Sequence, residues 1–190
     1  MDISLRTKEL MRLPRRWSQI LTRISARGHE VAHVSTSPLP SLGNPYIAYG
    51  LGACFSLKKA LVTGADIFLA NALETGALSY LSKRLRKRKF VFDYTDHYAS
   101  LASYEGDKLR TYYTPSLQNT IPNLADHVIV VKEEFRKRCL SCGLPESMIT
   151  VIPNGVDTRA FNPDVKGEEI REELGIVENP LVVYVGKVEE

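Results

Sequence analysis

Residues 151–163 constrain the fold of this chain more than any other stretch. They begin as a short apolar run, which Pro153 ends because proline cannot donate a hydrogen bond to a neighbouring strand. Asn154-Gly155 follows, and this pair tolerates positive φ so well that it predicts a sharp turn. Asp157 can accept hydrogen bonds from the amides after it, and Phe161 supplies one large apolar anchor. By itself the pattern predicts a strand, a tight turn and a loop.

Two further blocks flank this stretch. One precedes it, with the sequence ADHVIVVK at 125–132, and one follows it, with the sequence LVVYVGK at 181–187. In that order and at that spacing, the three blocks resemble the middle of the group 1 (family 4) retaining glycosyltransferases of the GT-B type. The family's corresponding motifs are AD-x-V-I-x-V-S, V-I-P-N-G-V-D-x-x-x-F-x-P and V-G-R, around the junction of two Rossmann-like domains. The resemblance covers about residues 17–187.

The resemblance implies an α/β fold with a Rossmann-like, doubly wound parallel sheet, the first half of a two-domain GT-B enzyme. Residues 1–152 are then the acceptor-side N-terminal domain, and residues 166–190 begin a truncated C-terminal domain that binds the donor. Residues 153–165 form the interdomain linker, with three residues at its turn: Asn154, Gly155 and Asp157.

The composition is that of an ordinary globular protein, with 190 residues, 44% hydrophobic and 25% charged. No stretch approaches the roughly 20 apolar residues of a membrane span, and no signal peptide is recognisable. The cysteines Cys54, Cys139 and Cys142 make no disulfide framework, and Cys139-x-x-Cys142 lacks the second pair of a zinc site. We therefore expect ordinary thiols and a cytoplasmic location.

The N-terminal region departs from the family. Ile3-Ser4-Leu5 is a poor first strand, and the Gly-Gly pair that approaches the donor diphosphate in many relatives is absent. Arg15 and Arg16 sit near that place, and a basic pair could bind the diphosphate instead. The apolar stripe of Trp17, Ile20, Leu21 and Ile24 predicts a helix that Gly28 ends.

Hydrophobic periodicity places the remaining elements. We expect strands at 31–34, 65–70 (buried), 90–94, 128–131 and 181–185, and helices at 53–62, 73–85, 132–142 and 168–174. Two segments are predicted to be irregular. One is a long loop at 36–52, where we expect contact with the acceptor, and the other is a polar stretch at 104–124, with a helix-like turn that Pro122 interrupts.

A basic run ends the predicted helix 73–85. Six of its seven residues are cationic: Lys83, Arg84, Arg86, Lys87, Arg88 and Lys89. One interpretation is a solvated helix end whose cations complement the helix dipole. The other is contact with an anionic membrane surface, since many relatives act on lipid-linked acceptors. Nucleic acid is disfavoured because no aromatic residues interleave with the cations.

The loop after strand 90–94 carries the preferred site residues, Asp96 and His97. Ligands of doubly wound sheets bind at the carboxyl ends of the strands. In similar enzymes an H-D or R-D-x-W-P signature occupies this loop and faces the donor sugar, so the resemblance gives Asp96 and His97 catalytic roles. The alternative is a pair of loop residues exposed to water.

The resemblance also assigns Lys187 to the departing diphosphate. No D-x-D occurs, which agrees with a GT-B enzyme that needs neither metal nor other cofactor. No two glutamates are spaced as in the family's donor-gripping E-x7-E motif, so we expect this chain alone to be inactive. Its partners would be a nucleotide-diphosphate sugar, bound through the missing domain, a sugar or lipid-linked acceptor, and possible peripheral contact with the cytoplasmic membrane face.

Two alternatives stay open. A non-catalytic or split-enzyme subunit would recruit a partner that supplies the donor domain, and the predicted strand 181–185 would then pair with that partner. An unrelated Rossmann enzyme such as an epimerase is disfavoured, because G-x-G-x-x-G is absent. The donor base, the donor sugar and the acceptor cannot be read from the sequence.

Overall fold

A computed structural model describes five ranges of the chain: 15–33, 45–159, 161–164, 166–176 and 180–184. The chain divides into two compact units, Met1–Asn154 and Gly155–Glu190. The division falls inside the predicted linker, and the boundaries proposed at 152 and 165 stay predictions. In the second unit, the described helix is α8 (Glu168–Glu173).

Four parallel strands form the sheet of the first unit. Their spatial order follows the chain: β1 (Ile67–Ala70), β2 (Lys89–Tyr94), β3 (His127–Val130) and β4 (Ile149–Val151). The register pairs Phe68 with Phe90, Phe92 with Val128 and Val130 with Val151. All four carboxyl ends therefore meet at one edge of the sheet.

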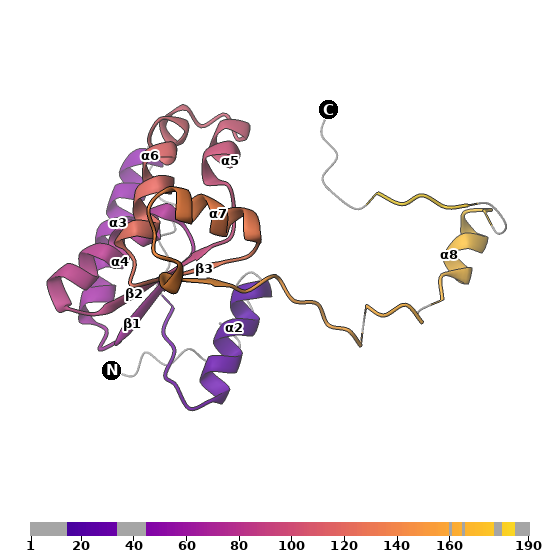
Figure 1. Ribbon diagram of the computed structural model, residues 1–190, viewed down its shortest axis with the longest axis horizontal. Coiled ribbons are helices and arrows are strands. Elements are labelled where there is room, and N and C mark those ends of the chain that lie inside the picture. Colours follow the sequence, from indigo (N-terminus) through magenta and orange to yellow (C-terminus); the bar gives the residue numbers. More distant parts are fainter. Residues whose placement is uncertain (1–14, 34–44, 160, 165, 177–179, 185–190) are drawn as a thin grey trace. The chain divides into compact units, whose positions relative to one another are not determined.

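Helices connect and cover the strands. α4 (Leu73–Arg86) joins β1 to β2, and α5 (Tyr98–Tyr104) with α6 (Lys108–Leu124) joins β2 to β3. α7 (Glu133–Ser141) and a short 3₁₀ turn (Glu146–Met148) lead to β4, and α2 (Arg15–Ala26) and α3 (Pro45–Val62) precede the sheet. Figure 1 shows α4, α6 and α7 on one side of the sheet and α2 on the other. Helices on both faces confirm the predicted α/β, Rossmann-like fold.

The core lies between the sheet and the layer of α4, α6 and α7. Phe90, Phe92 and Tyr94 alternate along β2 with residues of the opposite face, and all three are buried against the helices. The Tyr94 ring stacks between Phe135 of α7, at 4.7 Å between centroids, and Tyr98 of α5, at 5.8 Å. This aromatic stack packs the helices that follow β2 and β3 against the strand ends.

The prediction of an irregular segment at 104–124 is wrong. Most of it is α6, a helix of 17 residues that contains Pro115 and Pro122. Asp107 caps its first turn, because its Oδ1 accepts from the amides of Leu109 and Arg110, both at 3.0 Å. Its buried face consists of Thr114, Gln118, Ile121 and Pro122. Because two of these side chains are polar, the buried face does not stand out in the sequence as an apolar stripe.

Other predicted bounds also need correction. Residues 31–33 and 181–184 are not in strands, and helix α3 begins at Pro45, inside the predicted loop 36–52. In the described sheet β1 is an edge strand with Ile67 60% exposed, so it is not the fully buried strand expected. The first predicted strand and residues 36–44 lie outside the described residues.

Asp126 joins the start of β2 to the chain entering β3. Its Oδ2 accepts from the Phe90 amide at 2.8 Å, and its carboxylate pairs with Lys83 at 3.2 Å and Lys89 at 3.6 Å. Burial by itself would raise the pKa of Asp126. The Phe90 amide and the two ammonium groups outweigh burial and lower the pKa below its ordinary value.

We expect Gly76→Ala to destabilise the fold by about 1–2 kcal/mol. A Cβ at this position of α4 would lie 2.5 Å from Ile121 Cγ2. Overpacking costs about 1–3 kcal/mol, more than the roughly 1 kcal/mol that alanine contributes in a helix interior. Urea unfolding of the variant measures the difference. Gly64→Ala is the control, since nothing lies within 4 Å of its added carbon. A neutral or stabilising Gly76→Ala would contradict the packing.

We expect Asp126→Asn to remove an acid-sensitive part of the stability. A carboxyl whose folded pKa is lowered stabilises the fold above its ordinary pKa of 3.8, and that contribution is lost as the pH falls through the folded value. The free energy of unfolding should therefore differ between wild type and variant at neutral pH, by about 1 kcal/mol, and converge in acid. Urea unfolding at several pH values tests this. A constant difference down to low pH would contradict it.

Candidate functional site

Arg16 holds together three segments at the carboxyl edge of the sheet. From α2 its guanidinium makes a bidentate ion pair with Asp93 of β2, with Nε–Oδ2 at 3.1 Å and Nη2–Oδ1 at 3.0 Å. The same group donates to the Asn154 side chain at 3.0 Å and to the carbonyls of Ile152 and Pro153 at 3.4 and 3.5 Å. We call these contacts the Arg16 clasp.

The Arg16 clasp is largely shielded from water. The Asp93 side chain is 2% exposed and that of Arg16 is 16% exposed. Because Asp93 alternates with Phe92 and Tyr94, its carboxylate points to the face of the sheet that α2 covers. A buried carboxylate needs a paired cation, and the planar guanidinium matches it with two parallel hydrogen bonds.

The Arg16 clasp engages a side chain that was predicted to bind the donor diphosphate. Nε, Nη1 and Nη2 of Arg16 all donate to protein oxygens in this arrangement. Diphosphate binding by Arg16 stays a prediction, and it would require the side chain to leave Asp93. The Arg15 side chain and Lys187 lie outside the described residues.

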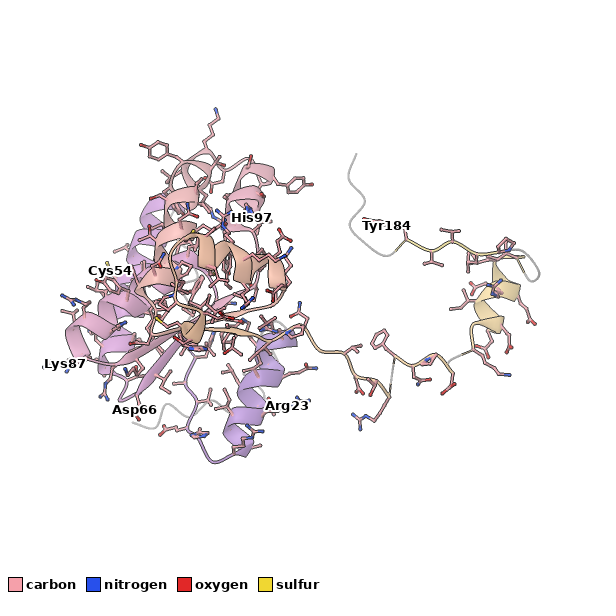
Figure 2. The ribbon with its side chains drawn as sticks, viewed as in Figure 1. Arg23, Cys54, Asp66, Lys87, His97 and Tyr184 are labelled. Carbon is pink, nitrogen blue, oxygen red and sulfur yellow. The ribbon has the colours of Figure 1, made fainter. Side chains whose placement is uncertain are left out.

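His97 lies at the centre of a second polar cluster, after the end of β2. It is the N-cap residue of α5, and its Nδ1 is 2.7 Å from Ser100 Oγ and 3.3 Å from the Ser100 amide nitrogen. Its Nε2 faces Arg138 Nη1 at 3.4 Å and Gln118 Nε2 at 3.5 Å. Figure 2 shows His97 among the helices above the sheet. Guanidinium and amide nitrogens only donate, so His97 Nε2 accepts from them in the tautomer that carries the ring proton on Nδ1, and Nδ1 then donates to Ser100 Oγ.

The partners of His97 are themselves positioned. Gln118 is buried, and its Oε1 accepts from the Ala99 amide at 2.8 Å. Arg138 Nη2 donates to Asn119 Oδ1 at 2.8 Å. The network therefore ties α5, α6 and α7 to one imidazole, and it holds the ring in a defined orientation.

Two tyrosines border this cluster. The Tyr98 hydroxyl donates to the Asn71 carbonyl, which links the loops after β1 and β2. Burial raises the pKa of Tyr98 to about 12, so the hydroxyl remains a donor at neutral pH. Burial also raises the pKa of Tyr94, although the nearby Arg138 charge opposes this.

The structure places Asp96 and His97 in the expected loop at the carboxyl edge. Asp96 is exposed and accepts from Thr95 Oγ1 at 2.9 Å. Among the described residues, no hydrogen bond or ion pair joins the Arg16 clasp to Asp96 or His97. The linker residues belong to different units: Asn154 ends the first and accepts from Arg16, and Gly155 and Asp157 lie in the second. Asp157 pairs with Arg159.

Sequence reasoning missed Asp93, Gln118 and Arg138. Asp93 carried a usable signal, because an acidic residue inside the apolar run Phe90–Tyr94 must find a partner when the strand is buried. Gln118 and Arg138 carried none, since both have the polarity expected of exposed helix positions.

The basic run divides into paired and unpaired cations. Lys83 and Lys89 pair with Asp126, and Arg88 pairs with Asp66 at 3.0 Å. Arg84, Arg86 and Lys87 are exposed, and no ion pair among the described residues involves them. Half of the run therefore has a structural function.

The described residues contain neither a metal-ligand cluster nor a membrane-spanning helix. No three His, Cys, Asp or Glu side chains in this part of the chain are grouped as metal ligands. No helix in the same ranges is both long and apolar enough to cross a membrane.

The family profile described as Glycosyltransferase Family 4 matches residues 14–160. No curated protein matches the chain by sequence. Solved structures of Anabaena HepE are similar: the complexes with UDP-glucose, with UDP, and with UDP and glucose give TM-scores of 0.51, 0.52 and 0.50 at 17%, 15% and 18% identity. Each match covers 85% of this chain, and the chain spans about two fifths of HepE (40%, 41% and 41%). At this identity the likeness shows the fold.

We expect Arg16→Met to destabilise the first unit by about 3 kcal/mol, because it leaves the Asp93 carboxylate buried without a cation. Arg16→Lys should recover little, since an ammonium cannot reproduce the bidentate pair. Adding Asp93→Asn to Arg16→Met should restore part of the stability, and a double-mutant cycle by urea unfolding measures the coupling. Additive effects of the two substitutions would contradict a direct pairing.

Proposed function

This chain belongs to glycosyltransferase family 4, and we propose that it is the acceptor-side part of a retaining enzyme that transfers a hexosyl group from a nucleotide-diphosphate sugar. Residues 1–152 would form the acceptor-side domain, residues 153–165 the linker and residues 166–190 the start of the donor-binding domain. The single observation that carries the proposal is the family match over residues 14–160, which includes both the sheet and the linker turn. The fold shared with HepE, whose complexes contain UDP-glucose or UDP, supports it.

The proposed reacting groups are Asp96 and His97. They lie in the loop at the carboxyl end of β2, where doubly wound sheets bind ligands. The network of Gln118 and Arg138 orients the imidazole. Both ring nitrogens have protein partners in this arrangement, so His97 Nε2 would exchange Arg138 or Gln118 for a sugar hydroxyl when the acceptor binds. Lys187 and Arg15 would neutralise the departing diphosphate, and no metal would be needed.

The acceptor would be a sugar or a lipid-linked sugar, and this chain alone would not catalyse transfer. The absence of an E-x7-E motif from the sequence supports that second statement. The cytoplasmic location predicted from the cysteine content remains a prediction, and the three thiols are free in the structure.

A split-enzyme subunit is the second candidate. The observation that favours it is the exposure of apolar side chains at 181–184: Val182 is 94% exposed and Tyr184 is 73% exposed. A partner that supplies a donor domain would cover this segment.

Calorimetric titration tests the proposal directly. UDP- and GDP-sugars should bind to a form of the protein that is extended beyond Glu190, and should not bind to the 190-residue chain. Tight binding by the 190-residue chain would place the nucleotide in the first unit and contradict the assignment of the donor site to the C-terminal domain. Binding only after a separate partner is added would favour the split enzyme.

In the longer form, we expect His97→Asn to lower kcat by about 100-fold or more. Asparagine is a good N-cap, so α5 should keep its start while the imidazole is lost. The control is Tyr112→Ser, since Tyr112 is 87% exposed on α6. Nuclear magnetic resonance of the product reports whether the anomeric configuration is retained. An unchanged kcat in His97→Asn would show that His97 takes no part in the reaction.

A further inference from the structure

Helix α3 presents an apolar stripe to solvent. Leu51 is 41% exposed, Phe55 is 61% exposed and Val62 is 70% exposed, and with Lys58 they recur every three or four residues. This spacing places all four on one side of the helix. A surface helix normally buries such a stripe, so an exposed one indicates an interaction surface.

Helix α4, which packs beside α3, continues this surface. Leu81 is 40% exposed, Leu85 is 58% exposed, and Arg84 lies between them on the same side. Arg86 and Lys87 end the helix, where Lys87 has a left-handed backbone with φ of 53°. We call the outer stripes of the two helices, with these two terminal cations, the α3–α4 face.

A shallow hollow connects the two helix ends. It has a volume of about 300 Å³, and its lining includes Val62 of α3, Phe68 of β1, and Arg86 and Arg88. Apolar and cationic side chains from different segments therefore lie around one depression. Figure 2 shows Cys54 of α3 and Lys87 on the same side of the first unit.

The charge of the α3–α4 face has one sign. Helix α3 contains no acidic residue, and the single acidic residue of α4, Glu74, lies in its first turn and bonds to Tyr113 and Arg110. Among the described residues, no ion pair involves the cations of this face, which are Lys58, Arg84, Arg86 and Lys87. These are the cations left over after Lys83, Arg88 and Lys89 pair with carboxylates.

We propose that the α3–α4 face is a peripheral docking surface for an anionic lipid bilayer. Apolar side chains flanked by unpaired lysine and arginine complement the boundary between acyl chains and acidic headgroups. The long cationic side chains can reach the headgroups while Phe55, Val62 and Leu85 enter the apolar layer. The proposal concerns the first unit alone and does not depend on the glycosyl-transfer reaction.

Vesicle binding of the 190-residue chain tests this. Phosphatidylcholine vesicles with about one quarter phosphatidylglycerol should sediment the protein at low ionic strength, and pure phosphatidylcholine vesicles should not. Raising the salt to about 0.5 M should weaken binding, because screening shortens the reach of surface charges. Equal binding to both kinds of vesicle, or binding to neither, would overturn the proposal.

Two variants place the binding on this face. Arg84→Gln/Arg86→Gln/Lys87→Asn should lower the partition onto anionic vesicles by about 100-fold, since each cation near such a surface contributes about fivefold. Asparagine suits the left-handed position of Lys87. The charge-matched control is Arg23→Gln/Lys108→Gln/Lys137→Gln, whose three cations are exposed elsewhere. Equal losses of vesicle binding in both triple variants would show that only the net charge matters, and would overturn the assignment of binding to the α3–α4 face.

Phe55→Ser should lower the partition by about tenfold, and Tyr112→Ser is the control for an exposed aromatic residue on α6. Cys54 offers a direct reporter, because its thiol is exposed on α3 while Cys139 is buried. After Cys142→Ser, a polarity-sensitive dye at Cys54 should shift to the blue with anionic vesicles. If the dye emission shifts with protein concentration in the absence of vesicles, a second copy of the chain covers this face, and the proposal is overturned.

Discussion

The ion pair between Arg16 and Asp93 is the interaction on which the carboxyl edge of the sheet depends. Asp93 is a charge inside a strand whose neighbours are aromatic, and α2 supplies the cation that compensates its burial. The same guanidinium holds the backbone at 152–153 and the side chain of Asn154, so the end of β4 is fixed to the end of β2. A single side chain thus connects the first described helix, the centre of the sheet and the last residue of the first unit.

The opposite side of the edge is organised by donors and acceptors that are partly or fully buried. Tyr98 fixes the loop after β1, and His97, the first residue before the helix after β2, faces Arg138 of the helix after β3. Hydrogen bonds that share one imidazole in a region of low dielectric favour a single arrangement, because a displacement of the ring breaks several of them at once. A loop held in this way is suited to bind a ligand of defined shape.

Cations serve two purposes in this unit. Some are structural, as in the pairing of Lys83 and Lys89 with Asp126, which ties the entries of β2 and β3 together. Others, such as Arg84 and Lys87, keep their charge at the surface beside exposed apolar side chains. The sequence shows one basic run at 83–89, and only the positions of the carboxylates in the fold separate the two sets.

The sequence by itself determined the α/β class, the strands β1 to β3, the helices α2, α4 and α7, and the family, because hydrophobic periodicity and the turn chemistry of 151–163 are local properties. It did not reveal α6, whose buried face carries Thr114 and Gln118 and whose interior holds two prolines. Nor did it show that Arg16 contacts Asp93, 77 residues away in sequence. The tertiary structure decided these points, because pairing between distant residues and the burial of polar side chains depend on which surfaces the fold brings together.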